Sequence, residues 1–467
     1  MKVKDIFNDI EITGTTVDGL GIARIDSWVV FIPKVMEGDV ADIIITSKKR
    51  NHVFGKVVEL KKSSEQRVTP FCEHFGLCGG CSLQHIDYAE QLRIKQKFVE
   101  DTLQRIGKVG AKHVSPIIPC AETTHYRNRL DFAFASRRWL ANEELSNPEI
   151  KATGSFAGFH VPGRFDKIID INTCHLQPES ANTLRHFVKN FAVENGWTFY
   201  DTLKNEGFIR DMIIRNTTTG EWMVIVIFNS DENEKINSLM QALTKKFPEI
   251  TSLNYVINPK KNSTIYDLEV NLFSGRKYLL EEIGGLKFKI SPKSFFQTNT
   301  KQAAMLYHTA LQFASLTGTE TVYDLYTGTG TIANYVAGHC KKVIGIDSVP
   351  DAIEDAKENS RSNNIHNTEF FAGDIKETLS DDFISVHGKP DVIITDPPRV
   401  GMHPDVVKKM SETGVTKIVY VSCNPATQAR DIALLSENYS VTKIQPVDMF
   451  PHTSHVENVA LLERKYI

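Results

Sequence analysis

The sequence has no basic excess, no long apolar run and no low-complexity stretch. Its 54 Lys and Arg residues nearly balance 57 Asp and Glu residues, so with a net charge of −3 any nucleic-acid surface must come from local patches. No apolar run approaches the ~18 residues of a membrane-spanning helix, and we expect no membrane contact. Residues 1–9 lack the apolar core of a signal peptide, which predicts a cytoplasmic protein.

Cysteine is scarce, and its seven copies are an odd number. In a reducing compartment this count argues against a disulfide framework and favours metal binding or catalysis. The composition, 41% hydrophobic and 24% charged, is that of a globular protein without wholesale disorder. A chain of 467 residues exceeds what one hydrophobic core supports, so we expect roughly two to four domains.

Residues 1–62 alternate apolar and polar positions between turns such as Asp18-Gly19. This alternation predicts short strands, and about five strands in some sixty residues favour a small closed β-barrel of the oligonucleotide-binding kind. The basic runs 48–50 and 61–62 fit phosphate contacts and an ordinary solvated face equally well. The predicted strands are 11–17, 21–25, 28–32, 39–47 and 52–60.

Three thiols follow close together, in Cys72-x5-Cys78-Gly-Gly-Cys81. The two glycines permit the tight turn that convergence on one centre requires. Cys174 is the best candidate for a fourth thiol. Four thiolates fit an iron–sulfur cluster or structural zinc, and the spacing leaves that choice open. We interpret the nearby histidines as surface or supporting residues rather than ligands: His74, His85 and His175.

The region from 63 to 280 mixes helical and strand-like patterns. Residues 87–106 predict an amphipathic helix, with Ile106 on its apolar face. Basic and aromatic residues meet in Tyr126-Arg127-Asn128-Arg129 and in Arg137-Arg138, a pairing used on single-stranded nucleic acid but weak by itself. A further helix is predicted at 178–195, and strands at 130–135, 209–216, 222–229 and 252–258.

From residue 281 strands and helices alternate, which predicts an α/β fold with a parallel, doubly wound sheet. The strand 321–325 leads into a loop, Tyr326-Thr-Gly328-Thr-Gly330, whose glycines let a ligand approach the backbone at a helix N-terminus. The third glycine of the dinucleotide fingerprint is missing, which disfavours a nicotinamide-dependent oxidoreductase.

Carboxylates stand at successive strand ends. Asp324 ends the first strand, Asp347 ends the second, and Asp374 follows the third. Asp347 suits the two hydroxyls of a ribose, and Asp374 suits an adenine amino group. Any one of them is explained as an ordinary turn residue, but the set is similar to that of S-adenosylmethionine (SAM) methyltransferases.

Cys423 follows the apolar strand 417–421 and precedes Pro425, which ends the strand. A lone cysteine is most often a buried core residue. A thiol at the carboxyl end of a parallel strand, however, sits where doubly wound folds hold their ligands. Cys423 is therefore a candidate nucleophile. The preceding predicted strand, 392–395, ends in a second motif, Asp396-Pro-Pro-Arg399. Enzymes that methylate exocyclic amines carry an aromatic residue where this motif has Arg399.

This combination resembles the RNA uridine C5-methyltransferases, over nearly the whole chain. Residues 1–62 look like the family's TRAM domain, the Cys-x5-Cys-Gly-Gly-Cys segment resembles its four-cysteine iron–sulfur site, and residues 294–299 and 455–458 resemble its cofactor and terminal base motifs. Thr331 departs from members that carry Asn there, which predicts the loss of one cofactor contact.

The resemblance implies a role for each matching residue. Cys423 is the expected nucleophile and Glu457 the expected general base, although an exposed carboxylate is the alternative interpretation of Glu457. A 4Fe–4S cluster is the expected centre, with zinc as the alternative, on the ligands Cys72, Cys78, Cys81 and Cys174. The residues expected to contact SAM are Gln297, Tyr326, Gly328, Gly330, Asp347, Asp374 and Asp396. For Asp396 the alternative role is to hold the substrate base.

The expected activity is SAM-dependent methylation of uridine C5 in 23S rRNA by a monomer. The barrel (1–62) and the central domain (63–280) would grip RNA while one base enters the methyltransferase domain (281–467). A TRAM domain together with a cluster looks like the ribosomal RNA branch, because tRNA members commonly lack both. The alternatives are uridine methylation of tRNA, amine methylation through Asp396-Pro-Pro, and an iron–sulfur RNA-binding protein without catalysis.

Overall fold

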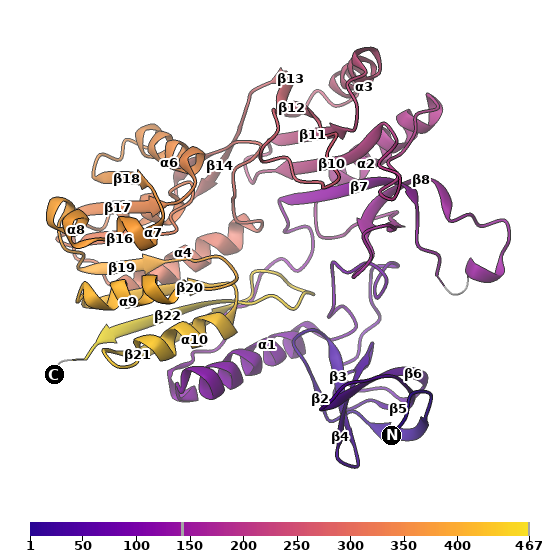
Figure 1. The fold of residues 1–467 in the computed structure, drawn as a ribbon, viewed down its shortest axis with the longest axis horizontal. Coiled ribbons are helices and arrows are strands. Elements are labelled where there is room, and N and C mark those ends of the chain that lie inside the picture. The colour runs from indigo at the N-terminus through magenta and orange to yellow at the C-terminus, as the bar shows by residue number, and fades with distance from the viewer. Residues whose placement is uncertain (142–143, 466–467) are drawn as a thin grey trace.

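The computed structural model describes residues 1–141 and 144–465, which form three sheets and a hairpin (Figure 1). Each sheet lies in a different part of the chain, so the fold is mixed α/β. In the described ranges, no helix combines the length and the apolarity needed to cross a membrane.

The first sheet is the predicted small barrel. Its edge strands, β1 (Ile6–Glu11) and β2 (Gly14–Thr15), are consecutive in the chain, so only two residues join the two edges of a six-stranded sheet. This short link requires the sheet to curl until its edges meet. The strand predicted at 11–17 is interrupted: it contains the end of β1 and all of β2, and between them buried Ile12 donates its N–H to the carbonyl of Asp39 where the chain turns. The other strands are β3 (Leu20–Ile25), β4 (Trp28–Pro33), β5 (Val40–Lys48) and β6 (His52–Lys62).

The second sheet has seven strands in the order β13-β12-β11-β10-β7-β8-β9. Helices α2 (Glu179–Glu194) and α3 (Asn233–Lys246) share a hydrophobic cluster with its central strands. Four strands and α2 confirm the predicted elements, whereas β8, β9, β13 and α3 have no counterpart in the sequence predictions. The strands are β7 (Arg129–Arg137), β8 (Thr153–His160), β9 (Ile168–Asp170), β10 (Ile209–Asn216), β11 (Trp222–Phe228), β12 (Ile250–Ile257) and β13 (Asn271–Gly275).

The third sheet also has seven strands, in the order β18-β17-β16-β19-β20-β22-β21. The first five are parallel, as predicted. The expectation of a wholly parallel sheet is wrong at one edge, because β22 is antiparallel to both of its neighbours. The strands are β16 (Thr321–Leu325), β17 (Lys342–Asp347), β18 (Thr368–Ala372), β19 (Val392–Thr395), β20 (Lys417–Ser422), β21 (Tyr439–Val447) and β22 (Glu457–Arg464).

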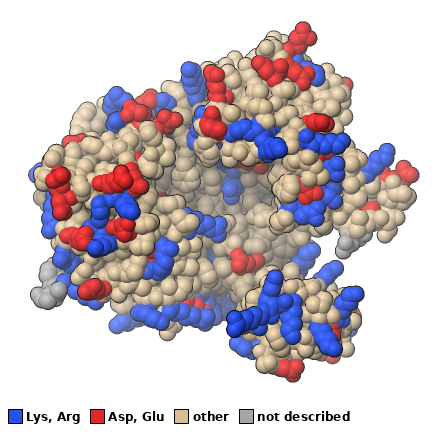
Figure 2. Space-filling model, viewed as in Figure 1, with Lys and Arg blue, Asp and Glu red and all other residues tan. Residues whose placement is uncertain are grey.

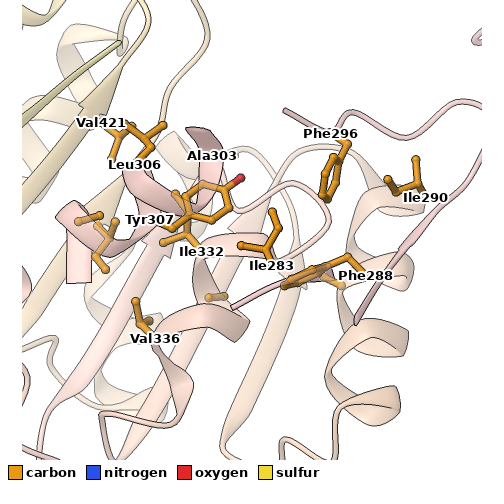
Figure 3. Packing of buried hydrophobic residues seen from close by; sticks show 14 of the residues in the cluster. Ile283, Phe288, Ile290, Phe296, Ala303, Leu306, Tyr307, Ile332, Val336 and Val421 are labelled. Atoms are coloured by element: carbon orange, nitrogen blue, oxygen red, sulfur yellow. The ribbon is translucent and has the colours of Figure 1, made fainter. Parts of the chain in front are cut away.

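Helices cover both faces of this third sheet. Alternation along β20 sends Val419 and Val421 to one hydrophobic cluster and Ile418 and Tyr420 to another. Figure 3 shows part of the first cluster, where side chains from α4, α5 and the β14–β15 hairpin pack together. The elements on this face are β14 (Leu279–Ile283), β15 (Leu286–Ile290), α4 (Thr300–Ala314), α5 (Thr331–Ala337) and α6 (Pro350–Ser362); the others are α7 (Ile375–Thr378), α8 (Asp381–His387), α9 (Pro404–Glu412) and α10 (Pro425–Leu435).

The predicted helix 87–106 ties the N-terminal half to the third sheet. It comprises α1 (Tyr88–Thr102), capped by Asp87, and a π-helical turn η1 (Leu103–Gly107), both packed against α10. The wider π turn leaves Ile106 45% exposed, so its predicted place on the apolar face is wrong. Lys95 of α1 forms a fully buried ion pair with Asp448, at 2.6 Å. Two short 3-10 turns are η2 (Ala111–His113) and η3 (Glu144–Ser146).

Breaking this buried pair should destabilise the fold strongly. Lys95→Met leaves the Asp448 carboxylate buried without its cation, and we expect a loss of about 3–5 kcal/mol in the free energy of unfolding. Lys97→Met is the matched control, because the Lys97–Asp101 pair on the same helix is exposed and worth less than about 1 kcal/mol. Urea unfolding followed by tryptophan fluorescence measures both. Equal losses in the two variants would contradict a structural role for the pair.

Candidate active site

A cavity of about 1290 Å³ opens at the carboxyl ends of β16, β17, β19 and β20. This edge is where doubly wound sheets bind ligands, because the strands stop there and the loops diverge. The cavity exceeds the ~300–1,000 Å³ of a typical small-molecule site, so it has room for a cofactor and part of a second ligand. The structure brings these predicted residues together in its wall: Gln297, Tyr326, Gly328, Asp347, Asp396, Cys423 and Glu457.

Strand register explains how the thiol meets a carboxylate distant in sequence. Cys423 directly follows β20 and precedes Asn424, the N-cap of α10. Ser422 pairs with Asn458 of the antiparallel strand β22, so Glu457 comes beside Cys423. The antiparallel direction of β22, which the sequence did not predict, therefore brings Glu457 to the site. Glu457 is only 4% exposed, so the alternative interpretation of an exposed carboxylate is wrong.

Burial controls the protonation of these three groups. It raises the pKa of Cys423 to about 11, and the neighbouring charges of Glu457 and Asp396 add to this while Arg399 opposes it. The pKa of Glu457 rises to about 8 and that of Asp396 to about 7, chiefly through burial. At neutral pH the free protein therefore holds a thiol and a protonated Glu457 side by side.

Arg399 is anchored to the turn that carries the thiol. Asn424 donates from Nδ2 to the carbonyl of Arg399 at 3.0 Å, and the Thr427 hydroxyl donates to the same oxygen at 3.3 Å. These two hydrogen bonds link the loop of Asp396-Pro-Pro-Arg399 to the Cys423 turn.

The predicted cofactor loop after β16 is shaped by two carboxylates. Buried Asp324 accepts hydrogen bonds at Oδ2 from the Thr327 hydroxyl at 2.5 Å and from the N–H of Ala333 at 3.1 Å. Asp347 accepts from the N–H of Gly328 and from the N–H of Val349, each at 2.9 Å. Each carboxylate oxygen has a further lone pair, so Asp347 keeps acceptor capacity for a ligand.

Two of the predicted cofactor residues do not line the cavity. Gly330 caps α5 with a φ of 74°, and a Cβ there would come within 2.9 Å of the Ala356 side chain, so packing requires glycine. Asp374 is exposed and caps α7, accepting from the N–H of Lys376 at 2.9 Å. Local helix capping accounts for this carboxylate, and its contact with a cofactor stays a prediction.

Sequence reasoning missed Tyr307. This buried residue of α4 lines the cavity and donates from its hydroxyl to Thr331 at 3.2 Å (Figure 3). It lies in the middle of a helix, without a motif, so no sequence signal marks it. The contact also engages the hydroxyl of Thr331, the residue that departs from the family pattern.

The four predicted metal ligands line a second cavity, of about 530 Å³: Cys72, Cys78, Cys81 and Cys174. Burial raises the pKa of Cys78 to about 11 and that of Cys81 to about 12, and the neighbouring thiols add to both. Among residues 1–141 and 144–465, no three His, Cys, Asp or Glu side chains converge closely enough to bind a single ion. His74 and His175 also line this cavity, whereas His85 does not.

Basic side chains gather on the barrel. Figure 2 shows Lys and Arg residues over the barrel and beside a hollow that separates it from the rest of the molecule. All of the basic residues predicted for phosphate contact are exposed, and Lys48 lies 4.3 Å from the centre of the Trp28 ring. In the central region Tyr126 is buried, with its hydroxyl bonded to the carbonyl of Pro451, so the predicted stacking role does not apply to it.

Comparison with known proteins gives the family. Residues 202–465 match the model described as tRNA (uracil-5-)-methyltransferase, and residues 8–58 match the TRAM domain. The chain belongs to the tRNA (uracil-5-)-methyltransferase family. Two relatives named as RNA methyltransferases come from Bacteroides thetaiotaomicron (51% identity, covering 96% of this chain and 99% of the relative) and Porphyromonas gingivalis (50%, covering 97% and 99%).

One solved structure is similar to this chain over nearly its full length. It is the Pyrococcus abyssi tRNA (uracil-54, C5)-methyltransferase in complex with S-adenosyl-L-homocysteine, with a TM-score of 0.74 and 29% identity over 97% of this chain and 100% of that one. The predicted TRAM domain and SAM methyltransferase fold are therefore confirmed. This member of the uracil-5 family is a SAM-dependent RNA methyltransferase.

Changing Asp347 should weaken SAM binding. Asp347→Asn removes a charged acceptor from the cofactor loop, and we expect affinity for SAM to fall about 10- to 100-fold, the range for a hydrogen bond to a charged group. Asp374→Asn is the control, because Asp374 lies outside the cavity wall, and its affinity should stay within about twofold. Titration calorimetry with SAM measures both. A loss in Asp374→Asn as large as that in Asp347→Asn would instead support the predicted contact of Asp374 with the cofactor.

Proposed function

We propose that this enzyme methylates C5 of a uridine in RNA through a covalent bond between Cys423 and C6 of the base. The observation that carries the proposal is the meeting of Cys423, Glu457 and Asp396 in one cavity with the glycine loop of the methyltransferase fold. The loop supports cofactor binding, the thiol supports nucleophilic catalysis and the buried carboxylate supports a base.

Uracil C5 is too weak a nucleophile to react unaided. In the proposed sequence the Cys423 sulfur bonds to C6, and the electron pair of the C5=C6 bond moves to C5 and the adjacent carbonyl. Bound SAM would supply an electrophilic methyl group to C5 and leave as S-adenosylhomocysteine. Glu457 then takes the C5 proton, the double bond re-forms and the sulfur leaves C6 as a thiolate. Burial raises the pKa of Cys423 to about 11 and that of Glu457 to about 8, so both groups are protonated in the free protein at neutral pH. Cys423 must therefore release its proton to water as attack occurs, and Glu457 must release its own to water before it takes the C5 proton.

The target base must leave its stack for C6 to reach the thiol. Asp396 and Arg399 lie beside Cys423, and we assign them to the polar edge of the base and to the orientation of the loop. The exposed basic residues of the barrel support a grip on the RNA backbone. We divide the chain accordingly into RNA-binding residues 1–62 and 63–280 and a methyltransferase domain, 281–467.

We expect 23S rRNA to be the substrate, because the barrel and the segment around Cys72, Cys78 and Cys81 (residues 71–83, the thiol segment) together resemble the ribosomal branch of the family. Transfer RNA is the second candidate. The Pyrococcus abyssi enzyme has a tRNA substrate in its name, and its 97% coverage of this chain includes most of the barrel. The barrel by itself therefore does not separate the two substrates.

We expect the four-thiol cavity to hold a 4Fe–4S cluster, with zinc as the alternative. Both centres accept four Cys thiolates, and all four cysteines line this one cavity. The expectation of a cluster rests on the resemblance of the Cys-x5-Cys-Gly-Gly-Cys segment to the family's iron–sulfur site. The four cysteines would hold such a cluster.

We also propose that the protein is located in the cytoplasm and acts as a monomer.

Fluorine at C5 provides the first test, because it cannot leave as a proton does. Fragments of 23S rRNA and of tRNA carrying 5-fluorouridine, incubated with protein and SAM, should give an adduct that shifts on a denaturing gel. Cys423→Ala should abolish it, whereas Cys340→Ala, a buried cysteine outside the cavity, should keep it. The RNA that forms the adduct identifies the substrate. Methyl transfer that persists in Cys423→Ala would favour amine methylation, and no transfer to either RNA would favour a binding protein.

Metal analysis tests the thiol centre. Protein purified without oxygen should contain about four iron and four sulfide per chain. Cys174→Ser should lose most of this iron, while Cys340→Ser should retain it. About one zinc per chain and no iron would contradict the cluster.

A further inference from the structure

Five consecutive residues, 448–452, lead from β21 towards Glu457 and form a segment that we call the strap. Each of these five residues accepts a hydrogen bond from, or donates one to, a residue outside the third sheet. Asp448 is bound by Lys95 at 2.6 Å and by the Tyr88 hydroxyl at 2.8 Å. The remaining contacts are Asn299 Nδ2 to the carbonyl of Met449 at 2.9 Å, Lys95 Nζ to that of Phe450 at 3.0 Å and the Tyr126 hydroxyl to that of Pro451 at 2.9 Å.

The last residue of the strap is held by the thiol segment. The N–H groups of Ser82 and Leu83, which directly follow Cys81, both donate to the carbonyl of His452, at 2.9 and 3.0 Å. The Phe71 ring, just before Cys72, meets the His452 ring edge-on at 5.0 Å. The chain segment that carries three of the four thiols therefore touches the strap directly.

Gln91 of α1 joins the two segments with one buried side chain. Its Nε2 donates to the carbonyls of Leu83 at 3.1 Å and Ile86 at 2.9 Å, and lies 3.1 Å from Nδ1 of His452. Its Oε1 accepts from the N–H of His452 at 2.9 Å. Gln91 is fully buried, so water cannot replace these bonds if the side chain is removed.

The backbone of His452 needs this support. Its φ of 65° lies in the left-handed region, which side chains other than glycine rarely adopt. Such a conformation persists only where the surroundings hold it in place. Without Gln91 the strap should relax at His452, five residues before Glu457.

We propose that Gln91 is a positioning residue, which fixes the thiol segment to the strap and thereby sets Glu457 beside Cys423. The inference rests on the proposed function, because it takes Glu457 to be the base. It gives the thiol segment a part in the reaction although none of its three thiols lines the cavity of Cys423.

The step that depends on this position is the last one. After methyl transfer, C5 carries both a methyl group and a proton, and C6 is bonded to the Cys423 sulfur. A displaced Glu457 cannot take the proton, so the electron pair of the C5–H bond does not re-form C5=C6 and the C6–S bond stays intact. Attack and methyl transfer do not need Glu457. Loss of Gln91 should therefore trap a methylated covalent adduct on ordinary uridine.

The test compares Gln91→Leu with Gln104→Leu, the same substitution at an exposed site on η1. Each protein receives unmodified substrate RNA and SAM labelled in the methyl group. Gln91→Leu should accumulate protein–RNA adduct that carries label, and its kcat should fall on the order of 10- to 100-fold, as expected for a misplaced catalytic group, with KM nearly unchanged. Gln104→Leu should behave as the wild type. Tyr126→Phe, which removes one bond to the strap, should trap a smaller fraction.

The outcomes separate the two proposals. If the wild type forms no adduct with 5-fluorouridine RNA, the proposed function fails. If it does, but neither Gln91→Leu nor Tyr126→Phe accumulates labelled adduct on ordinary RNA, the positioning role is wrong. A parallel fall in kcat and in RNA affinity without adduct would also overturn it, because that is the result of general loosening. Should Gln91→Leu fail to fold, the Tyr126→Phe variant decides: labelled adduct on ordinary RNA supports the role of the strap, and its absence contradicts it.

Discussion

The alignment of strand ends in the third sheet is the constraint on which the site depends. Parallel pairing sets Leu325 opposite Thr395 and Thr395 opposite Tyr420, so the loops after these strands start at nearly the same level. The cofactor loop, Asp396 and Cys423 then emerge at one edge. Antiparallel pairing of β22 adds Glu457 from the opposite chain direction. Hydrogen-bond register in the sheet thus brings the backbone segments that carry the reactive groups to one edge.

Burial of carboxyl groups at this edge of the sheet makes their ionised forms unfavourable. Three carboxyl groups, Asp324, Asp396 and Glu457, have pKa values raised to about 7 or 8 by desolvation. A group whose pKa is higher in the folded than in the unfolded state destabilises the fold as the pH rises from its unfolded pKa towards the raised value. Groups kept at such a cost are typical of functional sites, where a proton has to move near neutral pH.

Connections between distant parts of the chain hold this edge in place. The buried ion pair of Lys95 and Asp448, the Gln91 bonds and the thiol segment all act on the same five residues of the strap. A single loop therefore depends on α1, the thiol segment and the start of α4. The chain segment that carries Cys72, Cys78 and Cys81 thus contacts the strap, which leads to the active site.

The sequence by itself determined the features that are local. Strand periodicity gave the barrel and the five parallel strands, the Cys-x5-Cys-Gly-Gly-Cys spacing marked the thiols, and residues next to strand ends marked Asp347, Asp396 and Cys423, because a strand and the turn after it are encoded within a few residues. Tertiary structure alone decided the direction of β22, the exclusion of Asp374 from the cavity, the place of Tyr307 and the Gln91–His452 contact. That contact joins residues 361 positions apart, and neither partner carries a motif. Such pairings result from the packing of whole elements, which no local pattern specifies.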